Sequence, residues 1–273
     1  MDPIEINNKT GPRPVRQAEI HPTAVVHPSA RLGHNVRIGP HSVVGEDVVI
    51  GPDCVVGTSV LIEGHTTIGR NNRFFHGAAI GCEPQDKKFE GELSYVEIGD
   101  HNDFREYVTV QQATGEGEST RVGSGNLIMA YVHIAHNCHI HDNIVIANAV
   151  NMAGHVEVER NATIGGMTPV HQFVRVGAFA FVGGASRLPQ DVPPFIKVAG
   201  NPVEVAGVNS IGLKRNGFTD NDLIQLKKAY RLLYRSGLNV TQAMERIAAD
   251  CELSPHIEEL MAFIRRSDRG IVR

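Results

Sequence analysis

The chain has 273 residues, enough for one large or two modest domains with an apolar core. With 26 basic against 30 acidic residues and a pI of about 6.4, nucleic-acid binding is not expected. No run approaches 18 apolar residues and no charged segment precedes an apolar one near the start, so neither a membrane span nor a secretory signal is predicted. The four cysteines show no Cys-x-x-Cys spacing, which favours reduced thiols in a cytoplasmic protein.

Residues 1–17 contain three prolines and mixed charges, and we expect them to form a loose N-terminal arm. From Ile20 to Leu188 an apolar residue then recurs every six positions. Of 29 such positions only Asp86, Glu92 and Glu116 are not apolar, which leaves 26. This periodicity is typical of a β-helix, in which each unit is a short strand and a corner.

Three six-residue units would close one coil of 18 residues, and coils would stack by parallel pairing at about 4.8 Å. We therefore predict an all-β parallel β-helix over residues 18–195. A glycine often follows the periodic residue, as at Gly33, Gly39 and Gly45, and we expect it to permit the turn. An ordinary β-sandwich is the alternative, but sandwiches do not keep a strict period over so many units.

Two segments interrupt the periodicity and are polar or rich in glycine, residues 81–95 and residues 111–121. We expect both to be loops that leave the prism, a place where solenoid proteins often carry function.

Residues 196–273 follow a run of prolines and predict a linker and a small α-helical domain. Thr219 should cap one helix, Thr241 should begin a second, and Ser254-Pro255 should start a third. Residues 211–273 hold 11 basic and 8 acidic residues, a charge of +3.

The segment 131–143 holds four histidines, His133, His136, His139 and His141. An 18-residue coil places His136 one coil from Gly154, next to His155, and brings His171 to the same corner. Histidine is readily poised as a base near neutral pH, and a glycine N–H can bind a developing oxyanion. This combination favours acyl transfer. His139 and His141 are expected to be solvated.

Several motifs resemble one family. They are "HIAHNC" at 133–138, "MAGHV" at 152–156, "GGMTPVHQF" at 165–173, "QDVPPF" at 190–195 and "GVNSIGLKR" at 207–215. Together with the repeat they resemble the acyl-(acyl-carrier-protein)–UDP-N-acetylglucosamine O-acyltransferases, which open lipid A synthesis. The resemblance covers about residues 20–273.

The resemblance implies a left-handed β-helix, an exception to the right-handed crossover rule, and a cytoplasmic homotrimer with active sites between prisms. It implies that His136 is the general base and Gly154 the oxyanion donor. It further implies a nucleotide-sugar site and no cofactor or metal. The residues implied to line this site are Asp86, Lys88, His133, His155, His171, Gln172, Asn209 and Arg215.

The sequence departs from the family pattern at three places. Asn137 follows His136 where many members have aspartate, "QQAT" at 111–114 replaces "HRGT", and Pro202 stands where some relatives have histidine. The acyl length, and the choice between a 3-hydroxyl and a 3-amino sugar acceptor, are therefore open. The resemblance also implies an acidic acyl carrier protein as partner, for which Lys227, Lys228, Arg231 and Arg235 would offer a basic face.

Three other functions are compatible with a histidine-bearing prism. A zinc-dependent enzyme like the prism-shaped carbonic anhydrases would use the histidines as metal ligands. A solenoid scaffold would use none of them. A related hexapeptide acyltransferase would take its acyl group from acetyl-CoA.

Overall fold

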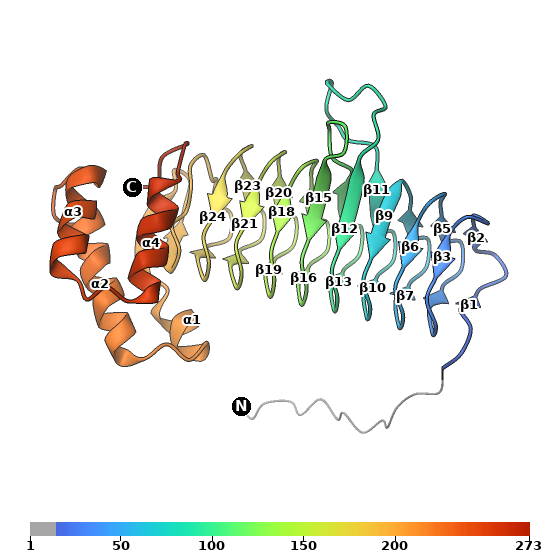
Figure 1. The fold of residues 1–273 in the computed structure, drawn as a ribbon, viewed down its shortest axis with the longest axis horizontal. Coiled ribbons are helices and arrows are strands. Elements are labelled where there is room, and N and C mark those ends of the chain that lie inside the picture. The colour runs from blue at the N-terminus through green and yellow to red at the C-terminus, as the bar shows by residue number, and fades with distance from the viewer. Residues whose placement is uncertain (1–14) are drawn as a thin grey trace.

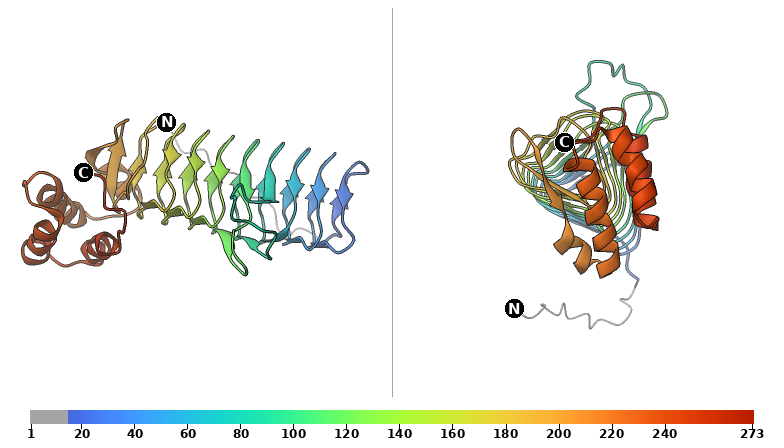
Figure 2. Two further views of the ribbon diagram at one scale, coloured as in Figure 1. Left: turned by 90° about the horizontal axis from the view of Figure 1, so that it is seen from above. Right: turned by 90° about the vertical axis from the view of Figure 1, so that its left-hand side faces the viewer.

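The computed structural model describes residues 15–273, so most of the expected N-terminal arm, 1–17, lies outside the described residues. Within them the chain is an elongated three-sided prism of parallel strands, with four helices at its C-terminal end (Figure 1). The right-hand view of Figure 2, from the end of the prism, shows the coils superimposed along its axis. The predicted fold class, a left-handed parallel β-helix with a small helical domain, is confirmed.

The three sides of the prism are three sheets, here called faces A, B and C. Face A contains β1 Glu19–Ile20, β4 Arg37–Ile38, β7 Val55–Val56, β10 Arg73–Phe74, β13 Asp103–Phe104, β16 Leu127–Ile128, β19 Val145–Ile146, β22 Thr163–Ile164, β25 Phe181–Val182, β26 Ile196–Ala199 and β27 Glu204–Val208. Strand β26 still pairs parallel with β25, so the sheet extends past the predicted boundary at 195.

Faces B and C have eight strands each. Face B contains β2 Val25–Val26, β5 Val43–Val44, β8 Leu61–Ile62, β11 Ala79–Cys82, β14 Thr109–Gln111, β17 His133–Ile134, β20 Asn151–Met152 and β23 Pro169–Val170. Face C contains β3 Arg31–Leu32, β6 Val49–Ile50, β9 His65–Ile68, β12 Tyr95–Ile98, β15 Ser119–Val122, β18 His139–Ile140, β21 Glu157–Val158 and β24 Arg175–Val176.

The strand register confirms the predicted coil length and explains why the periodicity survives its two interruptions. In the regular coils each strand residue pairs with the residue three six-residue units later in the sequence, as His133 does with Asn151. Across the first loop Arg73 pairs with Asp103, five units later, and across the second Asp103 pairs with Leu127, four units later. The loops therefore lengthen a coil by two units and by one unit. Because both insertions are whole units, the apolar side chains continue to point inward, and both loops project from the same part of the prism (Figure 1).

The prism interior is filled by the periodic aliphatic side chains in stacked layers, with Phe74 and Phe104 stacked at 4.9 Å between ring centroids. A buried ladder of Asn72, Asn102 and Asn126 runs through it, and each amide oxygen accepts a backbone N–H of a following coil or corner. The buried amides are thus satisfied, as a stable interior requires.

The expected role of the glycines after the periodic residue is wrong. Gly33 and Gly51 do not have a positive φ. Instead, a Cβ at Gly33 would lie 2.6 Å from the Pro52 nitrogen, and one at Gly51 would lie 2.5 Å from the Gly69 oxygen. These glycines are needed because neighbouring coils approach closely. The left-handed conformation falls two residues later at the corners, for example at Asn35 with φ 58°.

The C-terminal domain has helices α1 Ser210–Arg215, α2 Asp220–Tyr234, α3 Val240–Asp250 and α4 Pro255–Arg265. The predicted caps Thr219 and Ser254 are confirmed. Helix α3 begins one residue earlier than predicted, because Asn239 rather than Thr241 forms its capping box. Helix α1 was not predicted.

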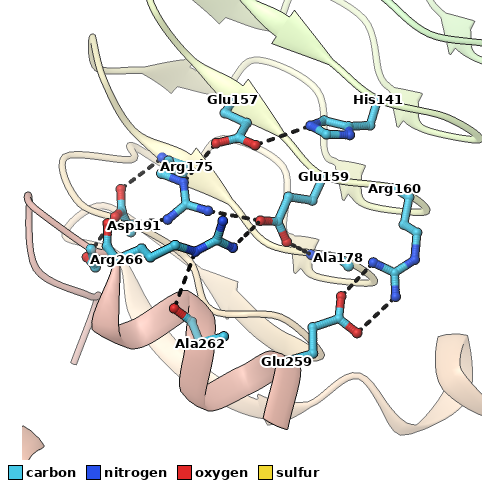
Figure 3. A network of polar contacts seen from close by, with 11 residues as sticks. His141, Glu157, Glu159, Arg160, Arg175, Ala178, Asp191, Glu259, Ala262 and Arg266 are labelled. Atoms are coloured by element: carbon cyan, nitrogen blue, oxygen red, sulfur yellow. Dashed lines mark hydrogen bonds and ion pairs between the residues drawn. The ribbon is translucent and has the colours of Figure 1, made fainter. Parts of the chain in front are cut away.

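An ionic network attaches this domain to the prism (Figure 3). Arg175 bonds Glu157 at 2.8 Å and Glu159 at 3.0 Å, and Arg160 reaches Glu259 of α4 at 2.9 Å. The buried Asp191 accepts a bond from Ser267 beyond α4. These contacts fix the helices relative to the last coils.

Candidate functional site

His136 lies at the corner between strand β17 of face B and strand β18 of face C. His133 lies on β17, and the chain reaches the corner at His136. This change of direction allows the two side chains to point to the same side of the chain. Backbone bonds from His155 N–H to the His136 oxygen, 3.1 Å, and from Phe173 N–H to the Gly154 oxygen, 3.2 Å, stack three corners. The column 136, 154, 172 is therefore one edge of the prism.

The imidazole of His136 covers Gly154. A Cβ at position 154 would lie 2.5 Å from His136 Nε2 and 3.0 Å from Nδ1, so no larger residue fits there without moving the ring. Gly154 itself is buried, and its N–H has no acceptor among residues 15–273. The structure thus brings together the predicted base and the predicted oxyanion donor.

Asn137 determines which nitrogen of His136 is available. Its Oδ1 accepts the Thr114 N–H at 3.0 Å, and its Nδ2 donates to the Thr114 oxygen at 3.1 Å, which fixes the orientation of the amide. The same Oδ1 lies 2.9 Å from His136 Nδ1. Nδ1 must therefore carry the proton, and Nε2 is left as the acceptor.

Asp86 comes to this nitrogen from the first loop. Its Oδ2 lies 3.8 Å from His136 Nε2, beyond hydrogen-bonding distance. The Lys88 N–H donates to Asp86 at 3.1 Å; this bond first, and nearby His136 next, hold the pKa of the Asp86 carboxyl below its usual value. Lys88 is exposed in the same loop.

His133 and His155 flank His136. His133 Nδ1 lies 2.7 Å from Thr109 Oγ1, and the His155 ring is perpendicular to that of His136 with centroids 5.3 Å apart. Burial lowers the pKa of both His133 and His155, and the neighbouring His136 lowers it further. These shifts favour the uncharged form of both imidazoles.

His171 and Gln172 lie one coil beyond Gly154, and both are exposed. His171 Nδ1 is 3.1 Å from the Gln172 oxygen. Among the described residues no ring contact joins His171 to the other imidazoles, so it borders the cluster without entering it. The aromatic neighbour of His155 is Phe173, with rings stacked at 4.6 Å.

Asn209 and Arg215 are not beside His136 within one chain. They line a groove of about 700 Å³ over face A, together with Lys197, Phe181 and Asn161. Asn209 caps helix α1 and donates from Nδ2 to the Phe179 oxygen at 3.0 Å. The predicted residues therefore form two groups, one at the corner of faces B and C and the other on face A.

Sequence reasoning missed Thr109, Thr114 and Phe173. Phe173 could have been found from the coil length, since it lies one full coil after His155. Thr114 could not, because it lies in a loop that follows no repeat.

The chain has well-covered relatives. It is 56% identical over 262 residues, 96% of this chain and 94% of the relative, to an acyl-(acyl-carrier-protein)–UDP-N-acetylglucosamine O-acyltransferase of Gloeothece citriformis. A Synechocystis enzyme of the same name is 50% identical over 77% of both chains. The family model "Udp N-acetylglucosamine O-acyltransferase; Domain 2" matches residues 191–272.

Solved structures agree with this result. UDP-N-acetylglucosamine acyltransferase LpxA of Bacteroides fragilis superposes with a TM-score of 0.91 at 40% identity, covering 93% of this chain and 99% of that one. LpxA of Acinetobacter baumannii gives 0.90 at 37% identity with the same coverage. These likenesses extend over the prism and the helical domain together. The chain belongs to the family of acyl-(acyl-carrier-protein)–UDP-N-acetylglucosamine O-acyltransferases.

Proposed function

We propose that this enzyme transfers a 3-hydroxyacyl chain from acyl carrier protein to the glucosamine 3-hydroxyl of UDP-N-acetylglucosamine, the first step of lipid A biosynthesis. The relatives' names give acyl-(acyl-carrier-protein) as the donor, UDP-N-acetylglucosamine as the acceptor and O-acyl transfer as the reaction. The observation that carries the proposal is the His136 ring resting on Gly154 with Nε2 as its free nitrogen. Family membership decides against the zinc-enzyme and scaffold alternatives.

The chemical step uses these two residues together. His136 Nε2 removes the proton of the sugar hydroxyl while its oxygen attacks the thioester carbonyl. The Gly154 N–H stabilises the negative charge on the carbonyl oxygen of the tetrahedral intermediate. When the C–S bond breaks, the imidazole returns the proton to the departing thiol. Asn137 holds Nδ1–H throughout and so orients the base, although a neutral amide raises basicity less than a carboxylate.

The remaining corner residues suit the nucleotide sugar. Asp86, His133 and His155 offer hydrogen bonds around His136, His171 and Gln172 offer them one coil further on, and Phe173 provides an apolar surface. Lys88 and Arg215 supply positive charge for the diphosphate.

A homotrimer would join the two groups of residues into one site. If face A of one copy packs near face B of the next, Asn209 and Arg215 approach the corner of its neighbour. The corner between faces A and B supports this packing, because its column of stacked residues exposes Tyr107, Tyr131 and Met167, the last at 70%. An exposed apolar stripe of this kind is typical of a subunit interface.

The carrier protein would dock on α2. Lys227, Lys228, Arg231 and Arg235 are all exposed on or directly after this helix, whose buried side is formed by Leu223, Leu226, Ala229 and Leu233. Acyl carrier proteins are acidic, so complementary charge would guide their approach.

One incubation tests the function. The protein is mixed with UDP-N-acetylglucosamine and a panel of 3-hydroxyacyl carriers, and products are read by mass spectrometry. We expect a mono-O-acylated nucleotide sugar from one preferred chain length. Acylation only of a 3-amino analogue would shift the proposal to amide formation, whereas a product formed from acetyl-CoA but not from the carrier would contradict it.

A further inference from the structure

Face C carries a cluster of potential metal ligands that the acyl-transfer site does not use. His139 on β18 and His141, two residues later, both point outward, and Glu157 on β21 faces them from the next coil. Their ligand atoms all lie within 4.8 Å of one another. The predicted solvation holds for His139, which is exposed, but His141 is half-buried beside the Glu157 carboxylate.

The spacing of two of these atoms already suits a single metal ion. His141 Nε2 and Glu157 Oε1 are 3.2 Å apart. Two ligands bound at 2.0–2.2 Å in tetrahedral geometry stand about 3.3 Å apart. A cation could therefore replace the proton between these two atoms with almost no movement of the backbone.

The third ligand can reach the same point. The His139 and His141 rings are stacked with centroids 4.0 Å apart. His139 is exposed, and its ring has no hydrogen-bond partner among residues 15–273. It can therefore turn its nitrogen toward the cation without breaking a hydrogen bond, although the stacking on His141 would change.

The two nearby guanidinium groups are each paired with carboxylates, which offsets their repulsion of a cation. Arg121 adjoins His139 in register, but its Nε lies 3.2 Å from Glu97. Arg175 is shared between Oε2 of Glu157 and Glu159, so Oε1 of Glu157 stays on the side of the histidines. Figure 3 shows Glu157 between His141 and Arg175. This arrangement fixes the carboxylate and orients it toward the two imidazoles.

We propose that His139, His141 and Glu157 form a second site on this enzyme that binds a divalent late transition metal such as Zn²⁺. Imidazole and carboxylate ligands suit Zn²⁺, Ni²⁺ and Cu²⁺, and are a poor match for Mg²⁺ or Ca²⁺, which prefer oxygen ligands. With three protein ligands the site leaves a position open for water. The metal would link two coils close to the network that holds the helical domain.

The test uses the full-length protein, stripped with a chelator and dialysed against Zn²⁺ at low micromolar concentration, with bound metal measured by elemental analysis. We expect one Zn²⁺ per chain and a rise in melting temperature on binding. His139→Ala, which removes only an exposed side chain, should weaken binding at least about tenfold. Glu157→Gln should do the same while keeping an oxygen that can accept from Arg175.

A matched control removes two exposed histidines elsewhere, His27→Ala with His41→Asn. The protein has 14 histidines, so scattered surface binding must be distinguished from a built site. Equal loss of zinc in this control and in His139→Ala would overturn the proposal, as would unchanged binding in both. Because none of the three ligands belongs to the acyl-transfer site, His139→Ala should keep full transferase activity, and this inference can fail without affecting the proposed function.

Discussion

The corner at His136 and the groove at Arg215 differ in how they are built. The first lies inside the repeat, where each residue has a neighbour one coil away and backbone hydrogen bonds join successive corners. The second lies where the repeat has ended, on a helix capped by Asn209. Under the proposed function this contrast becomes a division of roles: the repeat would supply the reacting groups, and the non-repeating tail would supply binding groups to the site of a different copy.

The largest effect is expected at the corner. Gly154→Ala puts a methyl 2.5 Å from His136 Nε2 and should displace the ring. We expect kcat to fall about 10²–10⁴-fold, similarly to His136→Ala, since both remove general-base catalysis. Steady-state kinetics measure this. Gly45→Ala is the control, because its added methyl would lie 3.2 Å from Cα and Cβ of Glu63 and 3.5 Å from the Ile62 oxygen, none of which belongs to the proposed site. Normal turnover by Gly154→Ala would refute the assigned geometry.

A smaller loss is expected at Asn137. Asn137→Ala removes the acceptor for Nδ1–H and should lower kcat about 10–100-fold, the range seen when an orienting partner of a histidine is lost. Asn137→Asp keeps this acceptor and should retain most activity, but its second oxygen would face the Thr114 oxygen, now 3.1 Å from Nδ2. Equal activity of the alanine and native enzymes would show that the amide does not orient the base.

Mixing variants tests whether the two groups form one site. Arg215→Ala should raise KM for UDP-N-acetylglucosamine about tenfold or more through loss of a charged hydrogen bond, with kcat little changed. Random trimers of Arg215→Ala and His136→Ala would pair both intact residues at about a quarter of interfaces. At a UDP-N-acetylglucosamine concentration well below KM, the mixture should recover about a quarter of the native activity. No recovery in verified mixed trimers would mean that the two residues do not form one site across the subunit boundary.

The tail also carries a smaller, salt-dependent effect. Reversing charge at Lys227 and Arg231 should raise the apparent KM for the carrier protein several-fold without changing kcat, and added salt should shrink the difference. Reversal at Arg265, an exposed basic residue of α4, is the control. An apparent KM for the carrier protein equal to that of the native enzyme would show that α2 does not take part in carrier recognition.

The smallest effect concerns the ion pair of His141 and Glu157. Hydrogen bonding to His141 lowers the pKa of Glu157 from 4.5 to about 2, and Glu157 raises the pKa of His141 above 6.5. The carboxylate stabilises the fold above pH 4.5, and the imidazolium does so below pH 6.5. Melting curves should therefore show the greatest deficit of His141→Ala, by a few degrees, between these values, and less toward pH 2 or pH 9. A deficit independent of pH would mean that the ring contributes only by packing.

The sequence predicted what the repeat controls. Inward positions such as Ile134 and Met152, and the meeting of His136 with Gly154, follow from a constant coil length. Three features did not follow. Asn137 binds Thr114, which lies in a loop without periodicity. Helix α1 is too short to show an apolar pattern. Glu157 is in register with His139, yet its carboxylate contacts the His141 ring. Contacts that depend on side-chain direction or on loops are set by tertiary packing.

The left-handed corners have a consequence for how this molecule can change. Asn137, His155 and Phe173 are successive residues of one column, with φ of 57°, 60° and 63°. Residues other than glycine adopt the left-handed conformation at a cost of about 1–2 kcal/mol each. Glycine at 155 or 173 would relieve the backbone strain but would also remove the imidazole or phenyl ring at that position. A search for variants with a higher melting temperature would select glycine at these positions. Each such gain in stability would lower the activity of the enzyme.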